Sequence, residues 1–172
     1  MYKRQTSTTS LLNLNTLSEF IDFYNHFDSR RRQQLVEKTA WPLRLVRDHG
    51  SVTGFIMPAL RPEFYITITL RNSVQRSTEA TIEQLCLKPL ILHNRGTVIS
   101  RRDEYLLLKD LSEVLSFLHS EGVVVGDFSV KNIFYALRPN PKVFIIDCDS
   151  MILHGKCCLL YTSDAADDCC RV

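Results

Sequence analysis

The chain has 172 residues, of which 45% are hydrophobic and 23% are charged, and its formal net charge is +2. This composition is typical of one globular domain and excludes disordered, collagen-like and coiled-coil proteins. No apolar run approaches the roughly 20 residues that a membrane-spanning helix needs, and the beginning of the chain lacks the layout of a secretory signal peptide. We therefore expect a cytoplasmic protein without a membrane partner. The net charge is too small to indicate nucleic acid.

The two ends of the chain differ in character from the rest. Four of the six cysteines fall within residues 157–172. Residues 158–162 and residues 1–5 can be encoded by nearly reverse-complementary strings, which look like the transposase end sequence used to prepare sequencing libraries. We interpret residues 1–5 and 157–172 as adapter-derived scars and exclude them from the fold prediction. The natural segment is then expected to be truncated on both sides. Its remaining cysteines, Cys86 and Cys148, indicate a reducing compartment.

The first part of the natural segment predicts a helical region followed by a β-hairpin. Thr16-Leu-Ser-Glu19 has the spacing of a capping box, and apolar residues follow it at helical spacing. Arg30-Arg-Arg32 interrupts this stripe, and we interpret it as a solvated helix face rather than a phosphate site. Proline ends the helical region at Trp41-Pro42. Two β-prone runs flank the turn signal Asp48-His-Gly50 and predict a hairpin over residues 43–57.

A proline-rich connector and a short helix are predicted next. Pro58 and Pro62 bound the connector, because proline interrupts regular structure. Residues 65–70 are compatible either with a strand or with an extended loop. Residues 81–87 predict a short helix that ends before Pro89.

The last part of the natural segment predicts a long helix and a second hairpin. Ser100-Arg-Arg-Asp103 has the pattern of a helix start, and Gly122 marks the end of the apolar stripe that follows. Residues 133–136 and 143–146 predict two strands, which Arg138-Pro-Asn-Pro141 joins in a hairpin. Together these elements predict an α+β fold.

Three oxygen-bearing side chains are expected to converge at one end of this second hairpin. A short loop after the long helix presents Asp127 and Asn132, and the second strand delivers Asp147 at its C-terminal end. Oxygen ligands of this kind suit Mg²⁺, which completes its coordination shell with water and substrate phosphates. The sequence therefore predicts a magnesium and phosphate site at this end of the hairpin.

This order of residues resembles the protein kinase family. The catalytic loop of that family reads H-R-D-x-x-x-x-N, and Asp127 and Asn132 keep the spacing of its aspartate and asparagine. The family's D-F-G motif follows the next hairpin, where this chain has Asp147-Cys-Asp149. The Asp-x4-Asn element alone is weakly specific, but its combination with the following hairpin is more informative.

The chain is most similar to a bacterial branch of kinase-like proteins that carries four further motifs in a fixed order. They occur here as Trp41-Pro-Leu43, Gly54-Phe-Ile-Met-Pro58, Val125-Gly-Asp127 and Ile146-Asp-Cys-Asp-Ser150. The resemblance covers residues 40–153 and implies a partial protein kinase-like fold. Residues 6–60 would be part of the N-lobe, with a helix, the hairpin and the hinge. Residues 61–156 would be part of the helical C-lobe, with the catalytic loop and the second hairpin.

The resemblance also implies a role for each site residue. Asp127 would orient the acceptor hydroxyl and accept its proton, and Lys131 would approach the transferring phosphate. Asn132 and Asp147 would bind Mg²⁺ on the ATP phosphates, and Asp149 would add a second carboxylate near the metal. The hinge residues beside the adenine would be Met57, Pro58, Ala59 and Leu60.

The chain departs from the family pattern in ways that keep other functions open. The family's histidine and arginine before the catalytic aspartate are Val125 and Gly126 here. No glycine-rich phosphate loop and no strand lysine for the ATP phosphates is identifiable before residue 40. Glu19 and Glu37 are both candidates for the glutamate that would pair with such a lysine.

The resulting expectation is a fragment of an ATP-dependent protein kinase, Ser/Thr-directed, that transfers the γ-phosphate of ATP to a hydroxyl with Mg²⁺. The truncated chain itself is expected to be inactive. One alternative is a small-molecule phosphotransferase of the aminoglycoside or choline kinase type, and another is a nucleotide-binding pseudokinase scaffold. An α+β domain without chemistry is the remaining alternative. Nucleic acid would be a partner only if segments outside this chain carry a DNA-binding element.

Overall fold

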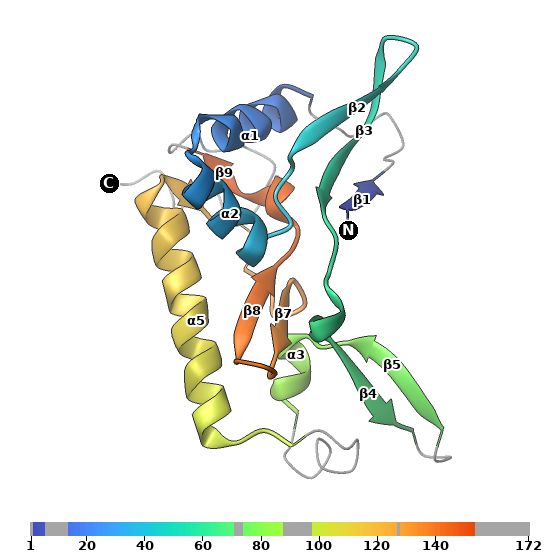
Figure 1. Cartoon of the computed structure of the whole chain (residues 1–172), viewed down its shortest axis with the longest axis vertical. Coiled ribbons are helices and arrows are strands. Elements are labelled where there is room, and N and C mark those ends of the chain that lie inside the picture. The colour runs from blue at the N-terminus through green and yellow to red at the C-terminus, as the bar shows by residue number, and fades with distance from the viewer. Residues whose placement is uncertain (1, 6–13, 71–73, 88–97, 127, 154–172) are drawn as a thin grey trace, which may run out of the picture.

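The computed structural model describes residues 2–5, 14–70, 74–87, 98–126 and 128–153 (Figure 1). These residues have the predicted α+β fold class, with four α-helices and small antiparallel sheets. The helices are α1 (Leu14–His26), α2 (Ser29–Lys38), α3 (Ile82–Leu85) and α5 (Arg101–Ser120). The strands are β1 (Tyr2–Gln5), β2 (Arg44–Asp48), β3 (Ser51–Pro58), β4 (Tyr65–Thr69), β5 (Gln75–Glu79), β6 (Val123–Val124), β7 (Ile133–Ala136), β8 (Lys142–Ile145) and β9 (Ile152–Leu153).

Two helices lie where the sequence predicts one continuous helical region. The capping box predicted at Thr16 is wrong, since α1 begins at Leu14 and Thr16 lies inside its first turn. A helix does not require a side-chain cap, because water can satisfy its first amides. Asp28 starts the second helix, since its side chain accepts the Arg31 N–H at 2.9 Å. Arg30 and Arg31 are exposed, as expected for a solvated helix face, and Arg31 forms ion pairs with Asp28 and Glu121. Arg32 departs from this prediction, since it is half-buried and its Nε has no hydrogen-bond partner among the described residues.

Strands β2 and β3 form the predicted hairpin. Asp48 pairs with Ser51, so that only His49 and Gly50 lie in the turn, with φ angles of 45° and 83°. Two consecutive positive φ angles define the turn type whose twist matches a two-residue hairpin, and glycine adopts the second one without strain. Residues 2–5, which were excluded from the fold prediction, pair with the other edge of β3 as β1. Pairing at a strand edge uses backbone groups and requires no particular side chains.

The predicted elements between the two hairpins are present. Residues 65–70, compatible with a strand or a loop, contain β4, and β4 pairs with β5 in a ribbon that projects from the body (Figure 1). Helix α3 lies within the predicted helical residues 81–87. The capping box of α5 is confirmed, since the Asp103 N–H donates to Ser100 Oγ and the Ser100 N–H donates to Asp103 Oδ2, both at 3.1 Å. Helix α5 ends before Gly122, as predicted.

The β7–β8 hairpin is buried on both of its faces. Strand β8 is displaced by one residue from the prediction, because it begins at Lys142 and ends at Ile145. Successive strand side chains point to opposite faces. On the face toward α1, α2 and α5, the side chains that belong to the larger core cluster are those of Ile133, Tyr135, Val143 and Ile145. On the opposite face, the side chains that belong to a smaller cluster are those of Phe134, Ala136 and Phe144. The apolar run in each strand follows from this two-sided burial.

The hydroxyl of Tyr135 is buried and has no hydrogen-bond partner among the described residues. We expect Tyr135→Phe to raise the free energy of unfolding by about 1 kcal/mol, because the variant buries no unpaired polar group. Burial also raises the pKa of Tyr135 to about 12, from its ordinary value of 10.0. The wild-type chain should therefore lose stability as the pH rises through this range, and the variant should lose less.

Urea denaturation of both chains at about pH 7 and about pH 11 measures the two effects of Tyr135→Phe. A variant that is less stable than the wild type at neutral pH would contradict the prediction. If both chains lost the same free energy of unfolding at alkaline pH, the pH dependence expected from the raised pKa of Tyr135 would be contradicted.

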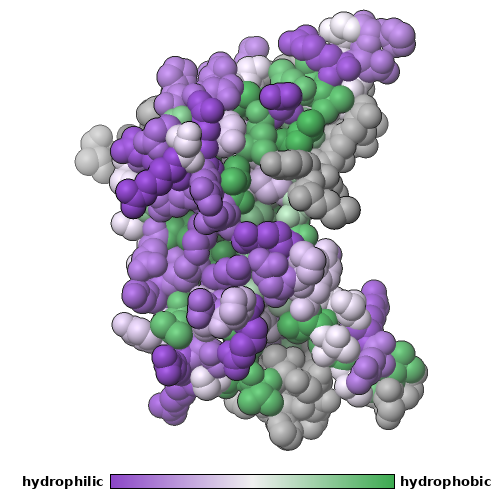
Figure 2. Space-filling model, viewed as in Figure 1, coloured by the Kyte–Doolittle hydropathy of each residue, from purple (hydrophilic) through white to green (hydrophobic). Residues whose placement is uncertain are grey.

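Figure 2 shows where hydrophilic and hydrophobic side chains gather on one face of the molecule. Hydrophilic side chains cover the side formed by α2 and α5, whereas hydrophobic side chains gather over the β2–β3 hairpin. The half-buried apolar side chains of that hairpin include Leu45, Val46, Val52 and Ile56. In the part of the chain that the structure describes, none of the helices has the length and apolar character needed to cross a membrane.

Candidate functional site

The β7–β8 hairpin brings Asn132 and Asp147 together at one end. Asn132 immediately precedes β7, Asp147 follows β8 closely, and the antiparallel strands pair Ile133 with Ile145. The Ile146 N–H donates to the Asn132 carbonyl at 2.9 Å. The Asn132 amide group, through Nδ2, donates to Asp147 Oδ2 at 3.4 Å. Two of the predicted magnesium ligands are therefore neighbours, and the amide oxygen of Asn132 is the atom that could ligate a cation.

The backbone of Asp147 is left-handed, with φ 63° and ψ 39°. This conformation costs a non-glycine residue about 1 kcal/mol or more, and aspartate tolerates it better than most residues. The Asp147 carbonyl accepts hydrogen bonds from the Ser150 hydroxyl at 2.8 Å and from the Ser150 N–H at 3.2 Å. These bonds hold the turn Cys148–Ser150 against the end of β8 and thereby fix the backbone from which the Asp147 carboxylate projects.

The donor set of Asn132 and Asp147 fits Mg²⁺. This ion usually takes one or two protein oxygen ligands and completes its shell with water and substrate phosphates. Two further predicted residues cannot be added to this set, because Asp127 and the side chain of Asp149 lie outside the described residues. Among the residues whose side chains are described, no three His, Cys, Asp or Glu side chains cluster as metal ligands. The described part of the site is therefore one carboxylate and one side-chain amide, and the N–H of that amide faces the carboxylate.

Gly126 lies in close contact with the backbone of the turn that follows Asp147. A Cβ atom added at Gly126 would lie 2.6 Å from the Ser150 carbonyl oxygen. A side chain at this position would push the loop away from the turn, since backbone atoms cannot move aside as a flexible side chain can. Sequence reasoning noted Gly126 only as part of a motif. Its structural role is to let the loop approach the segment after β8.

We expect Gly126→Ala to destabilise the chain by about 1–3 kcal/mol, because overpacking forces a backbone shift. The same shift should weaken any ligand that binds at Asn132 and Asp147. Gly50→Ala is the matched control, since Gly50 has a positive φ but nothing within 4 Å of the added Cβ. It should cost about 1 kcal/mol through backbone strain and leave ligand binding unchanged. Thermal melts and ligand titrations compare the two variants. Equal ligand affinities would contradict the prediction.

Lys131 is exposed and is paired with a residue that the sequence analysis did not single out. Its ammonium Nζ lies 3.7 Å from Glu83 Oε1 in α3. No local signal in the sequence could have identified this partner, because the two residues belong to separate elements. Lys131 directly precedes Asn132 in the chain, and its role at the phosphates stays a prediction.

Two of the four predicted hinge residues, Met57 and Leu60, pack against the same apolar cluster as Ile146. Met57 and Pro58 are the last residues of β3, and Ala59 and Leu60 follow it. All four are half-buried. The side chains that pack against the smaller cluster are Met57, Leu60 and Ile146. Because Ile146 directly precedes Asp147, the hinge segment and the Asn132–Asp147 pair adjoin one hydrophobic layer.

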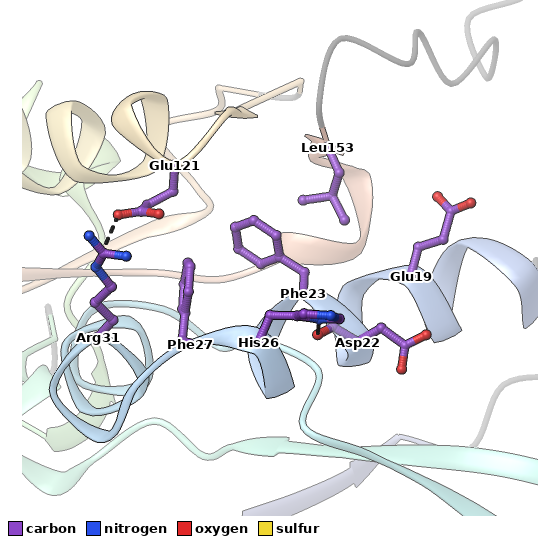
Figure 3. Close-up of a pocket in the computed structure, with 8 residues that line it drawn as sticks. All are labelled: Glu19, Asp22, Phe23, His26, Phe27, Arg31, Glu121 and Leu153. Carbon is purple, nitrogen blue, oxygen red and sulfur yellow. Dashed lines mark hydrogen bonds and ion pairs between the residues drawn. The ribbon is translucent and has the colours of Figure 1, made fainter.

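A separate hollow of about 560 Å³ lies beside α1 (Figure 3). Figure 3 places Glu19 and Leu153 at one end and the Arg31–Glu121 ion pair, at 3.4 Å, at the other. Its lining contains none of the predicted magnesium, phosphate or hinge residues. The two candidate glutamates differ in position. Glu19 lines this hollow, whereas Glu37 lies on the exposed surface of α2 and accepts a hydrogen bond from Gln33 at 2.8 Å.

No protein-family model matches the chain, and no curated protein matches it either. The functional interpretation therefore depends on the geometry of the Asn132–Asp147 pair and its surroundings.

Proposed function

We propose that the chain carries an ATP site of the protein-kinase-like type and derives from a phosphotransferase that acts on protein seryl or threonyl hydroxyls. The observation that carries this proposal is the Asn132–Asp147 contact of 3.4 Å at the end of the β7–β8 hairpin. Ile146 connects this pair to the apolar cluster on which the hinge residues pack. A carboxylate and an amide beside an apolar layer suit a ligand with one charged and one aromatic end.

The polar part of the site would hold the phosphates of ATP. Asn132 and Asp147 would bind Mg²⁺, which neutralises phosphate charge during transfer when it is bound. Lys131 carries a positive charge beside Asn132 and would attract the terminal phosphate. Asp127 would orient the acceptor hydroxyl and accept its proton, and Asp149 would add a second carboxylate.

The apolar part of the site would hold the adenine. The side chains of Met57 and Leu60 pack on the smaller cluster together with Ile146. Aromatic ligands bind where apolar side chains and a few backbone polar groups combine. Proline has no N–H, so Pro58 can contribute only a carbonyl acceptor, and the nearest donors after it are the amides of Ala59 and Leu60.

A nucleotide-binding scaffold without transfer activity is the second candidate function. No strand lysine for the ATP phosphates is identifiable between residues 6 and 40, where the resemblance would place it. A site that lacks this cation can still hold the nucleotide through its metal and hinge contacts. The candidate therefore shares the binding site with the first proposal and differs only in the chemical step.

The test is an ATP titration of the full chain followed by NMR, with Mg²⁺ present, with Mg²⁺ chelated, and with adenosine in place of ATP. We expect ATP to bind more tightly with Mg²⁺ than without it and to shift signals of residues 57–60 and 132. Binding that is independent of Mg²⁺, or that shifts neither region, would contradict the ATP site.

A transfer assay with radiolabelled ATP separates the candidate functions once binding is established. The acceptors are a mixture of unstructured serine- and threonine-rich proteins, an aminoglycoside, and choline. Label on protein favours the protein kinase, and label on a small molecule favours the small-molecule phosphotransferase. Binding without transfer is the result expected both of the scaffold and of a truncated kinase chain.

A further inference from the structure

Helix α3 is attached to the loop that precedes Asn132. The Glu83 N–H donates to the Val130 carbonyl at 3.2 Å. One residue further along the loop, Lys131 Nζ lies 3.7 Å from Glu83 Oε1. The main chain and the side chain of Glu83 therefore contact two consecutive loop residues, and the side chain contacts the one cation of the loop.

The segment before α3 is attached to the strand that leaves the loop. The Tyr135 N–H donates to the Ala80 carbonyl at 2.8 Å, and Thr81 forms an antiparallel bridge with Phe134. Residues 80–83 thus run beside residues 130–135. Because this backbone pairing does not involve the Glu83 carboxylate, the position of α3 is set independently of the ion pair.

The Glu83–Lys131 ion pair is expected to contribute little to the free energy of unfolding. The Lys131 side chain is 70% exposed and that of Glu83 is 52% exposed. Exposed pairs at this distance contribute little to stability and are screened by salt. A phosphate group carries more negative charge than one carboxylate and offers several acceptor oxygens. A phosphate that arrives beside Asn132 can therefore displace Glu83 as the partner of Lys131.

We propose that Glu83 pairs with the Lys131 ammonium in the free chain and competes for it with a nucleotide phosphate. The inference rests on the proposed ATP site and concerns the phosphate end of that site. It assigns Glu83 a competing role, since nucleotide binding requires the Lys131–Glu83 pair to open. Removal of the Glu83 charge then tightens the binding of phosphate-bearing ligands and leaves adenosine unaffected.

The first measurement compares dissociation constants for ATP with Mg²⁺ and for adenosine, in the full wild-type chain and in Glu83→Gln. Glutamine keeps the length of the side chain and the backbone hydrogen bond to Val130. We expect Glu83→Gln to bind ATP about two- to five-fold more tightly, which is the range that an exposed ion pair can supply. Adenosine should bind both chains equally, whereas a merely structural effect of the variant would shift both ligands alike.

Two further variants provide the controls. In a Lys131→Met background, Glu83→Gln should change the ATP affinity by less than about 1.5-fold, because only screened repulsion between Glu83 and phosphate remains. The matched control pair is Lys109–Glu113 on α5, which has the same 3.7 Å separation and similar exposure. Glu113→Gln should leave both affinities unchanged.

The outcomes separate this inference from the function on which it rests. Failure of the wild-type chain to bind ATP overturns both. ATP binding that Glu83→Gln does not tighten, or that it tightens equally in the Lys131→Met background, overturns the role of Glu83 and leaves the ATP site intact. Selective tightening that disappears with Lys131 supports the inference.

Discussion

Replacement of Trp41 by alanine is expected to lower the free energy of unfolding by about 3–5 kcal/mol, the range for removal of a large buried aromatic side chain. Trp41 is fully buried. Its ring lies 5.0 Å from that of Phe20 and 5.4 Å from that of Phe23. Its indole N–H donates to the Phe20 carbonyl at 2.9 Å. A domain of this size has about 5–15 kcal/mol of stability, so the loss could approach the whole of it.

The position of Trp41 in the fold explains why the effect should be global. The residues just before it join β8, since the Ala40 N–H donates to the Ile145 carbonyl at 2.8 Å and Thr39 forms a parallel bridge with Ile145. Trp41 therefore connects α1 to the β7–β8 hairpin. Loss of its ring leaves a cavity in the core cluster that α1 and the β7–β8 hairpin share.

Urea denaturation followed by far-ultraviolet circular dichroism measures the effect of Trp41→Ala. The far-ultraviolet signal is required because the chain has a single tryptophan. Trp41→Phe keeps an aromatic ring and loses the indole N–H, so it should cost clearly less than alanine. Val98→Ala removes an apolar side chain that is 74% exposed and should be neutral. A Trp41→Ala chain within about 1 kcal/mol of the wild type would contradict this role.

Asp147→Asn is expected to weaken the Mg²⁺-dependent binding of ATP by at least about tenfold. The substitution removes one negative charge from the proposed metal site but keeps the shape of the side chain. Asparagine is also the residue that tolerates a left-handed backbone best after glycine, so the φ of 63° at this position adds no new strain. The change therefore isolates the charge of Asp147 from its backbone role. Alanine would alter both.

Titrations with ATP, with and without Mg²⁺, measure the effect of Asp147→Asn. The dependence on Mg²⁺ should be strong in the wild-type chain and nearly absent in the variant. Glu113→Gln makes the same change of charge at an exposed site on α5 and serves as the control. If Asp147→Asn binds ATP as tightly as the wild-type chain and with the same Mg²⁺ dependence, Asp147 is not a metal ligand and the proposed function loses its main support.

Short-range signals account for the elements that were predicted correctly. The hairpin turn at His49 and Gly50, the capping box at Ser100 and the stop at Gly122 each depend on a few consecutive residues. The break at Asp28 was missed although aspartate is a favourable helix cap. Residues 28–34 are all polar, so no apolar periodicity marks where the first helix ends and the second begins.

Long-range contacts account for what could not be predicted. The ammonium of Lys38 donates to the Asp110 carboxylate, and the second oxygen of that carboxylate accepts the Val143 N–H at 2.8 Å. These contacts join α2, α5 and β8, which are separated by many residues in the chain. Nothing in the residue types of Lys38 or Asp110 distinguishes them from solvated surface charges, so only the packed structure identifies them as partners.

The candidate site combines both kinds of information. The approach of Asn132 to Asp147 could be predicted, because a hairpin brings the residues just outside its two strands together. The partner of Lys131 and the packing of Met57 and Leu60 beside Ile146 could not. The sequence alone determined the turn at His49 and Gly50, the cap at Ser100 and the oxygen-bearing residues at the hairpin end, since these depend on backbone preferences within a few residues. Tertiary structure decided which distant side chains meet, because that depends on how the buried faces of separate elements pack against one another.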